Sequence, residues 1–173
     1  MRRNNHKSEM LPMSDTRLEE AKRWLRVEFK NGRHAICPCC EQIVALRTRR
    51  LGKRQAKALA LLYRWDRRQP NQVLHVERYC KKERIDLGHD WQQLSKWNFI
   101  ECPDKGSGRW RITDTGVAFV EGNFAVKDRF YQFNSKTFWP EDGWPGPYKM
   151  ITFEEALEER FNLLEILNPI KRE

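Results

Sequence analysis

The sequence lacks several features that identify common classes of protein. It has no run of about 18 apolar residues, so we expect no membrane-spanning helix and no membrane partner. The arginines of its first six residues precede no apolar stretch, which argues against a secretory signal. Phosphate-binding glycine loops, the serine elbow of hydrolases and the His-Glu-x-x-His motif are all missing. No catalytic pair of carboxylates stands out either, so the sequence predicts no enzyme and no catalytic residue.

Acidic residues are in deficit, and this imbalance indicates the class of partner. The chain of 173 residues has 33 lysines and arginines against 24 acids, a formal net charge of +9. Hydrophobic residues make up 39% of it and aromatics 12%, which is enough for a folded core. A basic folded protein favours polyanionic partners, with nucleic acid ahead of an anionic membrane surface.

Cysteines are few, but three of the five lie within four positions. Such crowding suits a metal ion or free thiols in a reducing cytoplasm better than a disulfide framework. Cys37 and Cys40 have the Cys-x-x-Cys spacing of a zinc knuckle, which makes zinc the candidate cofactor. His34 or Cys39 are candidates for further ligands. His75 and Cys80 could also complete the site if the fold brings them there.

Two alternatives to zinc remain open for this cluster, namely a small metal-free turn and a redox pair. A closed zinc site needs four ligands, and no second Cys-x-x-Cys follows in the sequence. Glu41 also stands where a knuckle of this kind usually carries glycine. The redox alternative is the weakest of the three because no βαβ pattern surrounds the cysteines.

Turn residues and changes of charge divide the chain into four expected segments. These are a flexible arm over 1–14, an N-terminal helix with a cysteine hairpin over 15–50, a winged-helix domain over 51–122, and a C-terminal extension over 123–173. The first helix is expected over 15–29, and the hairpin over 34–46. The extension should contain a strand within 124–133 and an acidic amphipathic helix that begins after Thr152 and continues to Leu167. The apolar side of that helix is a candidate homodimer contact.

The segment 51–122 follows the order of a winged helix, in which three helices precede a hairpin. Apolar spacing and turn residues predict helices at 53–67, near 73–82 and from His89 or Asp90 onward. They predict the two strands of the hairpin at 99–102 and 109–112. Leu94, Trp97 and Ile100 recur every three residues, so one side of the third helix should lie in the core. The predicted fold class is α+β, with a winged helix-turn-helix core.

The exposed side of the third helix is the predicted reading surface, because folds of this order lay that helix in a DNA groove. Glutamine pairs with adenine edges, and lysine contacts guanine or phosphate. Base contacts are predicted for His89, Gln92, Gln93 and Lys96. Phosphate contacts are predicted for a run of cations uninterrupted by acids, from which we select Arg50, Lys53, Arg54 and Lys57. They are also predicted for Lys105 and Arg109, at the turn between the two strands of the hairpin.

Three stretches carry a resemblance to a known group of proteins: His-Ala-Ile-Cys-Pro-Cys-Cys at 34–40, Asp-Trp-Gln-Gln-Leu-Ser-Lys-Trp at 90–97 and Arg-Trp-Arg-Ile-Thr-Asp-Thr-Gly at 109–116. Together they resemble small bacteriophage-encoded proteins, mostly uncharacterised, that look like a Cys-Pro-x-Cys knuckle joined to a winged-helix module. The similarity covers about residues 18 to 165. It implies the fold and a phage or prophage origin, and it supplies no target.

These observations lead us to expect a cytoplasmic protein that binds duplex DNA and regulates transcription or another DNA transaction of a mobile element. The alternative is a protein-interaction module, an adaptor or inhibitor directed at a host protein that handles nucleic acid. Winged helices often bind proteins, and a basic module is a natural partner for such an enzyme.

Overall fold

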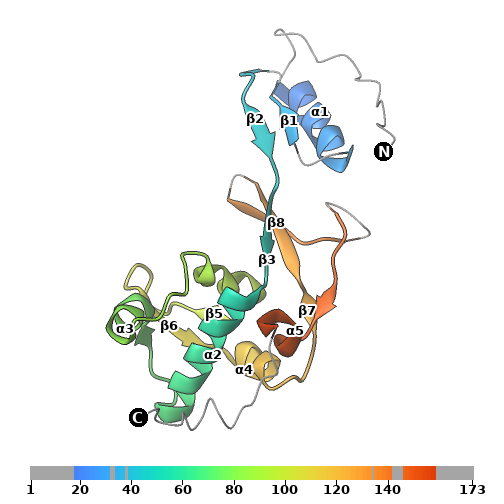
Figure 1. Cartoon of the computed structure of the whole chain (residues 1–173). Helices are drawn as coiled ribbons and strands as arrows, with labels where there is room; N and C mark the ends of the chain where they lie inside the picture. Colours follow the sequence, from blue (N-terminus) through green and yellow to red (C-terminus); the bar gives the residue numbers. More distant parts are fainter. Residues whose placement is uncertain (1–17, 32–33, 38, 134, 142–145, 159–173) are drawn as a thin grey trace. The chain divides into compact units, whose positions relative to one another are not determined.

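The computed structural model describes residues 18–31, 34–37, 39–133, 135–141 and 146–158. Over these residues the chain forms six helices and ten short strands, which confirms the α+β class (Figure 1). None of the described helices is both long and apolar enough to cross a membrane. The expected arm over 1–14 lies outside the described residues.

Contacts within the chain divide it into two compact units. Unit 1 comprises residues 1–49 and 130–147, and unit 2 comprises residues 50–129 and 148–173. Residues 123–129 and 148–173 belong to unit 2, and residues 130–147 belong to unit 1. The chain therefore passes between the units three times.

Unit 1 is built around a helix, a hairpin and a small sheet. Its elements are α1 (Leu18–Asn31), β1 (His34–Ile36), β2 (Ile43–Ala45), β3 (Arg47–Arg50), β8 (Arg129–Phe133) and β9 (Lys136–Phe138). β1 pairs with β2, and a separate sheet has the order β3-β8-β9. Ala35, Leu46 and Tyr131 form its buried core, with Trp24 and Phe138 among the side chains packed against them. Strand β3 was not predicted, because its Arg-Thr-Arg-Arg sequence has the composition of a solvated charge run.

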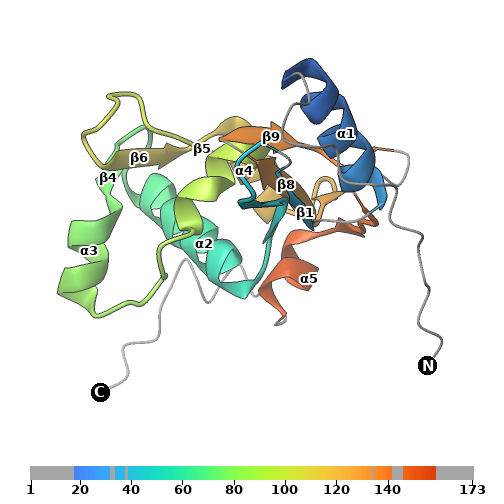
Figure 2. The same cartoon turned by 90° about the horizontal axis from the view of Figure 1, so that it is seen from above.

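Unit 2 contains the remaining elements. These are α2 (Lys53–Arg68), β4 (Leu74–His75), α3 (Val76–Glu83), η1 (Trp91–Trp97), β5 (Ile100–Glu101), β6 (Arg109–Ile112), α4 (Asp114–Val120), β7 (Val126–Lys127), β10 (Met150–Ile151) and α5 (Phe153–Leu157). The sheet order β4-β6-β5 places the last strand between the other two. Leu59, Leu62 and Tyr63 bury one side of α2. Figure 2 shows α2 running between α3 and α5.

The third helix of the predicted trio is present, but it winds as a 3₁₀-helix. Trp91, Leu94 and Trp97 are all buried in η1. A 3₁₀-helix has three residues per turn, so side chains three apart lie on one line. The indole of Trp91 meets that of Trp110 edge-to-face at 5.4 Å, which ties η1 to β6. Asn98, at φ 60°, ends the helix in the left-handed conformation.

A threonine cap and a close backbone approach fix the junction of β6 and α4. Thr113 Oγ1 accepts a hydrogen bond from the Gly116 N–H at 3.1 Å and donates to the Asn98 carbonyl at 2.5 Å. A Cβ at Gly116 would lie 2.2 Å from the carbonyl oxygen of Phe99. Only glycine fits at this point of the fold, so the Thr-x-x-Gly segment has a structural explanation.

The terminal helix is shorter than predicted. Thr152 caps α5, and its backbone N–H donates to Glu155 Oε2 at 2.7 Å. The helix ends at Leu157, because Glu158 adopts a left-handed φ of 59°. Its apolar residues Phe153 and Leu157 are buried, and α5 packs against α2 within unit 2. The apolar side of this part of the helix is therefore covered within unit 2. Positions from 159 onward lie outside the described residues, and the homodimer contact stays a prediction.

Candidate nucleic-acid interface

Positive charge is concentrated at the start of α2. Arg50 is exposed at the end of β3, Lys53 and Arg54 form the first helical turn, and Lys57 is exposed one turn later. That first turn contains no acidic residue, and its N-cap, Gly52, has no side chain to satisfy the free backbone N–H groups. Cations beside the positive end of a helix dipole are unfavourable by about 0.3–1 kcal/mol each. A bound phosphate would offset this cost and accept hydrogen bonds from the free N–H groups.

Arg54 brings this cluster beside the segment that leads into η1. A Cβ at Gly88 would lie 3.3 Å from Arg54 Nη1 and 3.6 Å from its Cδ, so the arginine covers Gly88. Gly88 has a φ of +65°, which glycine adopts at little cost. His89 follows directly and is exposed. Two groups predicted separately from the sequence, the phosphate-binding run and the base-reading segment, are thus adjacent here.

Three of the four residues predicted to face base edges are exposed. These are His89, Gln92 and Lys96. Gln93 is half-buried, and its amide Nε2 donates to Asp90 Oδ1 at 3.0 Å. An amide already held by a carboxylate has less capacity to pair with adenine, which needs both its donor and its acceptor.

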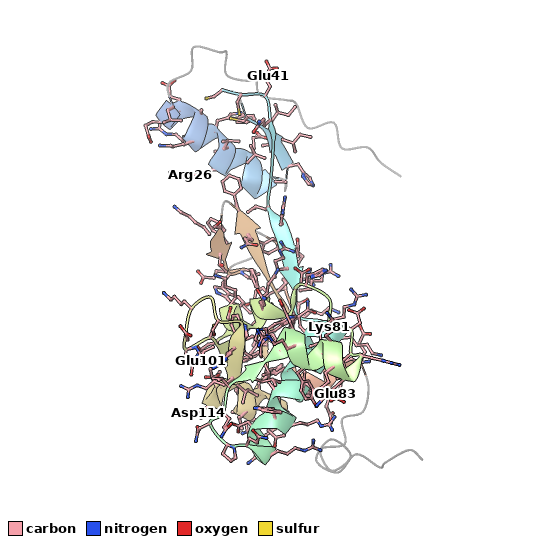
Figure 3. All side chains as sticks on the ribbon, turned by 90° about the vertical axis from the view of Figure 1, so that its left-hand side faces the viewer. Arg26, Glu41, Lys81, Glu83, Glu101 and Asp114 are labelled. Atoms are coloured by element: carbon pink, nitrogen blue, oxygen red, sulfur yellow. The ribbon has the colours of Figure 1, made fainter. Side chains whose placement is uncertain are left out.

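A groove of about 510 Å³ beside these residues contains charges of both signs. It is lined by α3 and by the segment that enters η1, and its lining includes Glu77, Lys81, Asp86, His89 and Gln92. Figure 3 shows Lys81 on α3, together with Glu83 near the end of that helix; both are exposed. Acids at this position weaken the attraction for phosphate that Lys81 provides.

The turn between β5 and β6 is held by its own side chains. Cys102 Sγ donates to the Asp104 carbonyl oxygen at 3.1 Å, and Ser107 Oγ accepts from the Arg109 N–H at 3.1 Å. Lys105 lies in this turn and is exposed. The turn therefore presents one cation on a loop of defined shape.

A second groove, of about 650 Å³, runs along α3 and the start of β6 and has a basic lining. Arg109 contributes to it, because the pairing of β4 with β6 places His75 opposite Arg109. Residues that were not predicted from the sequence line it too, among them Trp65, Arg78, Tyr79 and Lys82. Its lining residues include no acid. The four-residue spacing of Arg78 and Lys82 on α3 is the signal that could have revealed this surface.

The cysteine cluster closes the β1–β2 hairpin in a tight turn. The Cys37 N–H donates to the Gln42 carbonyl at 2.9 Å, and the Glu41 N–H donates to the Cys37 carbonyl at 2.8 Å. The backbone N–H groups of Cys39 and Cys40 donate to the Cys37 sulfur and hold the pKa of that thiol below its ordinary value. Glu41 adopts a φ of +56°, the conformation for which glycine is usual. Glu41 therefore supplies the backbone conformation that glycine usually supplies at this point of such a turn.

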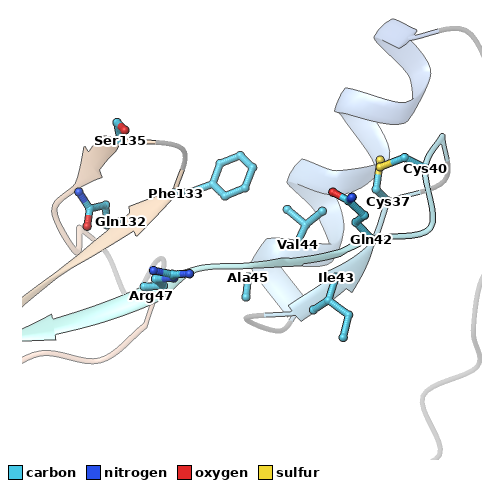
Figure 4. Close-up of a pocket in the computed structure, with 10 residues that line it drawn as sticks. All are labelled: Cys37, Cys40, Gln42, Ile43, Val44, Ala45, Arg47, Gln132, Phe133 and Ser135. Carbon is cyan, nitrogen blue, oxygen red and sulfur yellow. The ribbon is translucent and has the colours of Figure 1, made fainter.

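Two of the predicted metal ligands are brought together. Figure 4 shows the side chains of Cys37 and Cys40 pointing toward one another at the end of the hairpin. His34 lies at the other end of β1, opposite Ala45, and is not part of this pair. Cys80 is buried in α3 of unit 2, where burial raises the pKa of its thiol. Within the described ranges, no group of three or more His, Cys, Asp or Glu residues is placed to hold a metal ion.

Comparison with known proteins gives no match for this chain among protein-family models, curated proteins or solved structures.

Proposed function

We propose that this protein binds duplex DNA through unit 2, and that unit 2 is a winged helix. The order helix, strand, two helices, hairpin supports the fold, as does the sheet order β4-β6-β5. In folds of this order the helix before the hairpin enters a DNA groove, and the turn of the hairpin contacts the backbone. The motif resemblance supports a role in transcription or another DNA transaction of a phage or prophage.

The observation that carries the proposal is the cluster of cations at the start of α2, with Arg54 covering Gly88. It joins a phosphate-binding feature to the exposed side of η1 on one surface of unit 2. In the proposed complex, phosphates are held by Arg50, Lys53, Arg54, Lys57, Lys105 and Arg109. Base edges are contacted by His89, Gln92 and Lys96, with Gln93 in a lesser role.

The test is the salt dependence of binding to a random-sequence duplex, followed by fluorescence anisotropy. Affinity should fall steeply between about 50 and 200 mM salt, because each neutralised phosphate releases counterions. In the double variant Arg54→Gln/Lys57→Gln, the slope of log affinity against log salt should become shallower by about 1.8. Lys149→Gln is the control and should leave the slope unchanged. Lys149 is exposed next to β10, which pairs with β7. β7 lies on the far side of α2 from α3 (Figure 1). Absence of affinity at the lowest salt would refute the proposal.

One observation favours the alternative function, an adaptor or inhibitor of a host protein that handles nucleic acid. Glu77 and Asp86 lie in the same groove as His89 and Gln92. A surface of mixed charge suits a peptide with both charges better than it suits phosphate. A protein that fails to bind duplex but captures such a host partner, with capture lost in Glu77→Gln/Asp86→Asn, would favour this alternative.

A further inference from the structure

The hairpin turn of unit 1 provides half of a metal site. A tetrahedral zinc site without solvent has four protein ligands. Cys37 and Cys40 supply two sulfurs that point toward one another. No third His, Cys, Asp or Glu in the described part of the chain completes the set.

We propose that two copies of the chain share one zinc ion, to which each copy contributes Cys37 and Cys40. The four thiols lose their protons to solvent as four zinc–sulfur bonds form, and no oxidation or reduction takes place. The proposal is independent of DNA binding, because it concerns residues of unit 1 alone.

The turn is already arranged for coordinated thiolates. The backbone N–H groups of Cys39 and Cys40 point at the Cys37 sulfur and would spread the excess negative charge of a zinc ion bound by four thiolates. The hydrogen bonds between Cys37, Glu41 and Gln42 keep the turn closed, so binding orders little additional chain. Sulfur ligands in tetrahedral geometry select zinc over the oxygen-preferring cations.

The flanking residues indicate that the remaining ligands come from a second copy. Ile36 and Ile43 are paired across the hairpin next to the turn and are 49% and 77% exposed. Cys39 and Cys40 are exposed as well, so the end of the hairpin is open to a partner. A two-fold axis through the zinc would bring two identical turns together and allow each isoleucine pair to be covered. Covering exposed apolar side chains adds a favourable term to that of the metal bonds.

The experiment uses the full chain, made metal-free under a non-thiol reductant and titrated with Zn²⁺ or with Co²⁺ as a spectroscopic probe. Native mass spectrometry should show a species of two chains plus one zinc, which a chelator returns to monomer. Cobalt should give the intense absorption of a tetrathiolate site and saturate at one ion per two chains. One ion bound per monomer, or a dimer that forms without metal, would overturn the shared site.

Single substitutions identify the ligands. Cys37→Ser and Cys40→Ser should each abolish both metal uptake and the zinc-dependent dimer, whereas Cys39→Ser and Cys102→Ser should retain them. Circular dichroism checks that each variant is folded, and duplex affinity measured without metal provides a second readout that a local change at the hairpin leaves unaltered. Metal uptake that survives Cys37→Ser in a folded protein contradicts the proposal.

Discussion

At the scale of the residue, Gln92 and Gln93 give the sharpest test of base reading, because these neighbouring glutamines differ mainly in whether another side chain binds the amide. Gln92 is exposed, whereas the amide of Gln93 donates to Asp90. Once a preferred duplex has been selected, Gln92→Ala should reduce its advantage over random duplex by about 1–3 kcal/mol. Gln93→Ala should change that advantage much less. Competition binding measures both, and equal losses would show that the Asp90 contact does not survive in the complex.

Gly116 provides a test of packing. Alanine usually stabilises a helix by about 1 kcal/mol relative to glycine. At Gly116, however, the added Cβ would meet the Phe99 carbonyl oxygen at 2.2 Å and Ile112 Cγ1 at 2.7 Å. We therefore expect Gly116→Ala to lower the free energy of unfolding by about 3 kcal/mol. Gly52→Ala is the control for urea denaturation, since its Cβ would lie 3.8 Å from the nearest atom, Gln55 Oε1.

Asp128 makes stability depend on pH. The residue is 9% exposed, and its carboxylate accepts from Arg129 Nε and from the Lys149 N–H, each at 2.9 Å. Burial raises the pKa of this carboxyl, but the hydrogen bonds outweigh burial and the pKa lies below its ordinary value. The stabilisation is therefore complete above the unfolded-state pKa of about 4. It is lost as pH falls through the lower pKa of the folded protein.

Asp128→Asn should remove this contribution. The free energy of unfolding at pH 7 should fall by about 2 kcal/mol, because hydrogen bonds to a charged acceptor are replaced by weaker ones. Between pH 5 and the acid transition the variant should lose less stability than the parent protein. Urea titrations across that range compare the two, and parallel curves would show that Asp128 is not responsible for the acid sensitivity.

At the scale of the element, the two sides of α3 should differ in their effect on DNA affinity. Arg78 and Lys82 line the basic groove with Arg109, whereas Lys81 lines the groove that contains Glu77 and Asp86. Arg78→Gln/Lys82→Gln should weaken duplex binding and make its salt slope shallower by about 1.8. Lys81→Gln, measured by the same anisotropy titration, should change the salt slope less than Arg78→Gln alone or Lys82→Gln alone. If Lys81 has the larger effect, the phosphates follow the groove of Glu77 and Asp86 and not the basic groove.

Local sequence patterns predicted the elements whose buried side chains are close together in the sequence. The three-residue spacing of Leu94, Trp97 and Ile100 predicted that one side of the third helix is buried, and that spacing was also a signal for 3₁₀ winding. Strand β3 could not be predicted in this way, since its partner β8 lies some 80 residues later in the chain. β4 has two residues, too few for any periodicity.

The candidate site was predicted only in part, because local sequence patterns do not show which distant residues meet. The run from Arg50 to Lys57 is visible in the sequence, whereas the contact of Arg54 with Gly88 arises from tertiary packing. The basic groove escaped prediction because β pairing brings Arg109 to α3. The occupied amide of Gln93 could be seen only once the position of Asp90 was known.

At the scale of the whole molecule, the core of unit 1 depends on a distant segment. Tyr131 on β8 is fully buried with Ala35 and Leu46, yet the chain reaches it only after most of unit 2. We expect a fragment of residues 1–49 to remain unfolded by circular dichroism, because it lacks this aromatic side chain. Residues 50–173 contain all of unit 2 and should retain cooperative unfolding and duplex affinity. A folded 1–49 fragment would show that β8 and β9 are dispensable for the hairpin.

The three passages of the chain between the units also set an order of events during synthesis. Tyr131 is made roughly 90 residues after Cys40, which at ribosomal speed is a delay of about 5–20 seconds. During that interval the two hairpin thiols are already present, while the side chain that completes their core is still to be translated. The ribosome therefore presents the thiols to ions and oxidants on a nascent chain well before the unit that carries them can close.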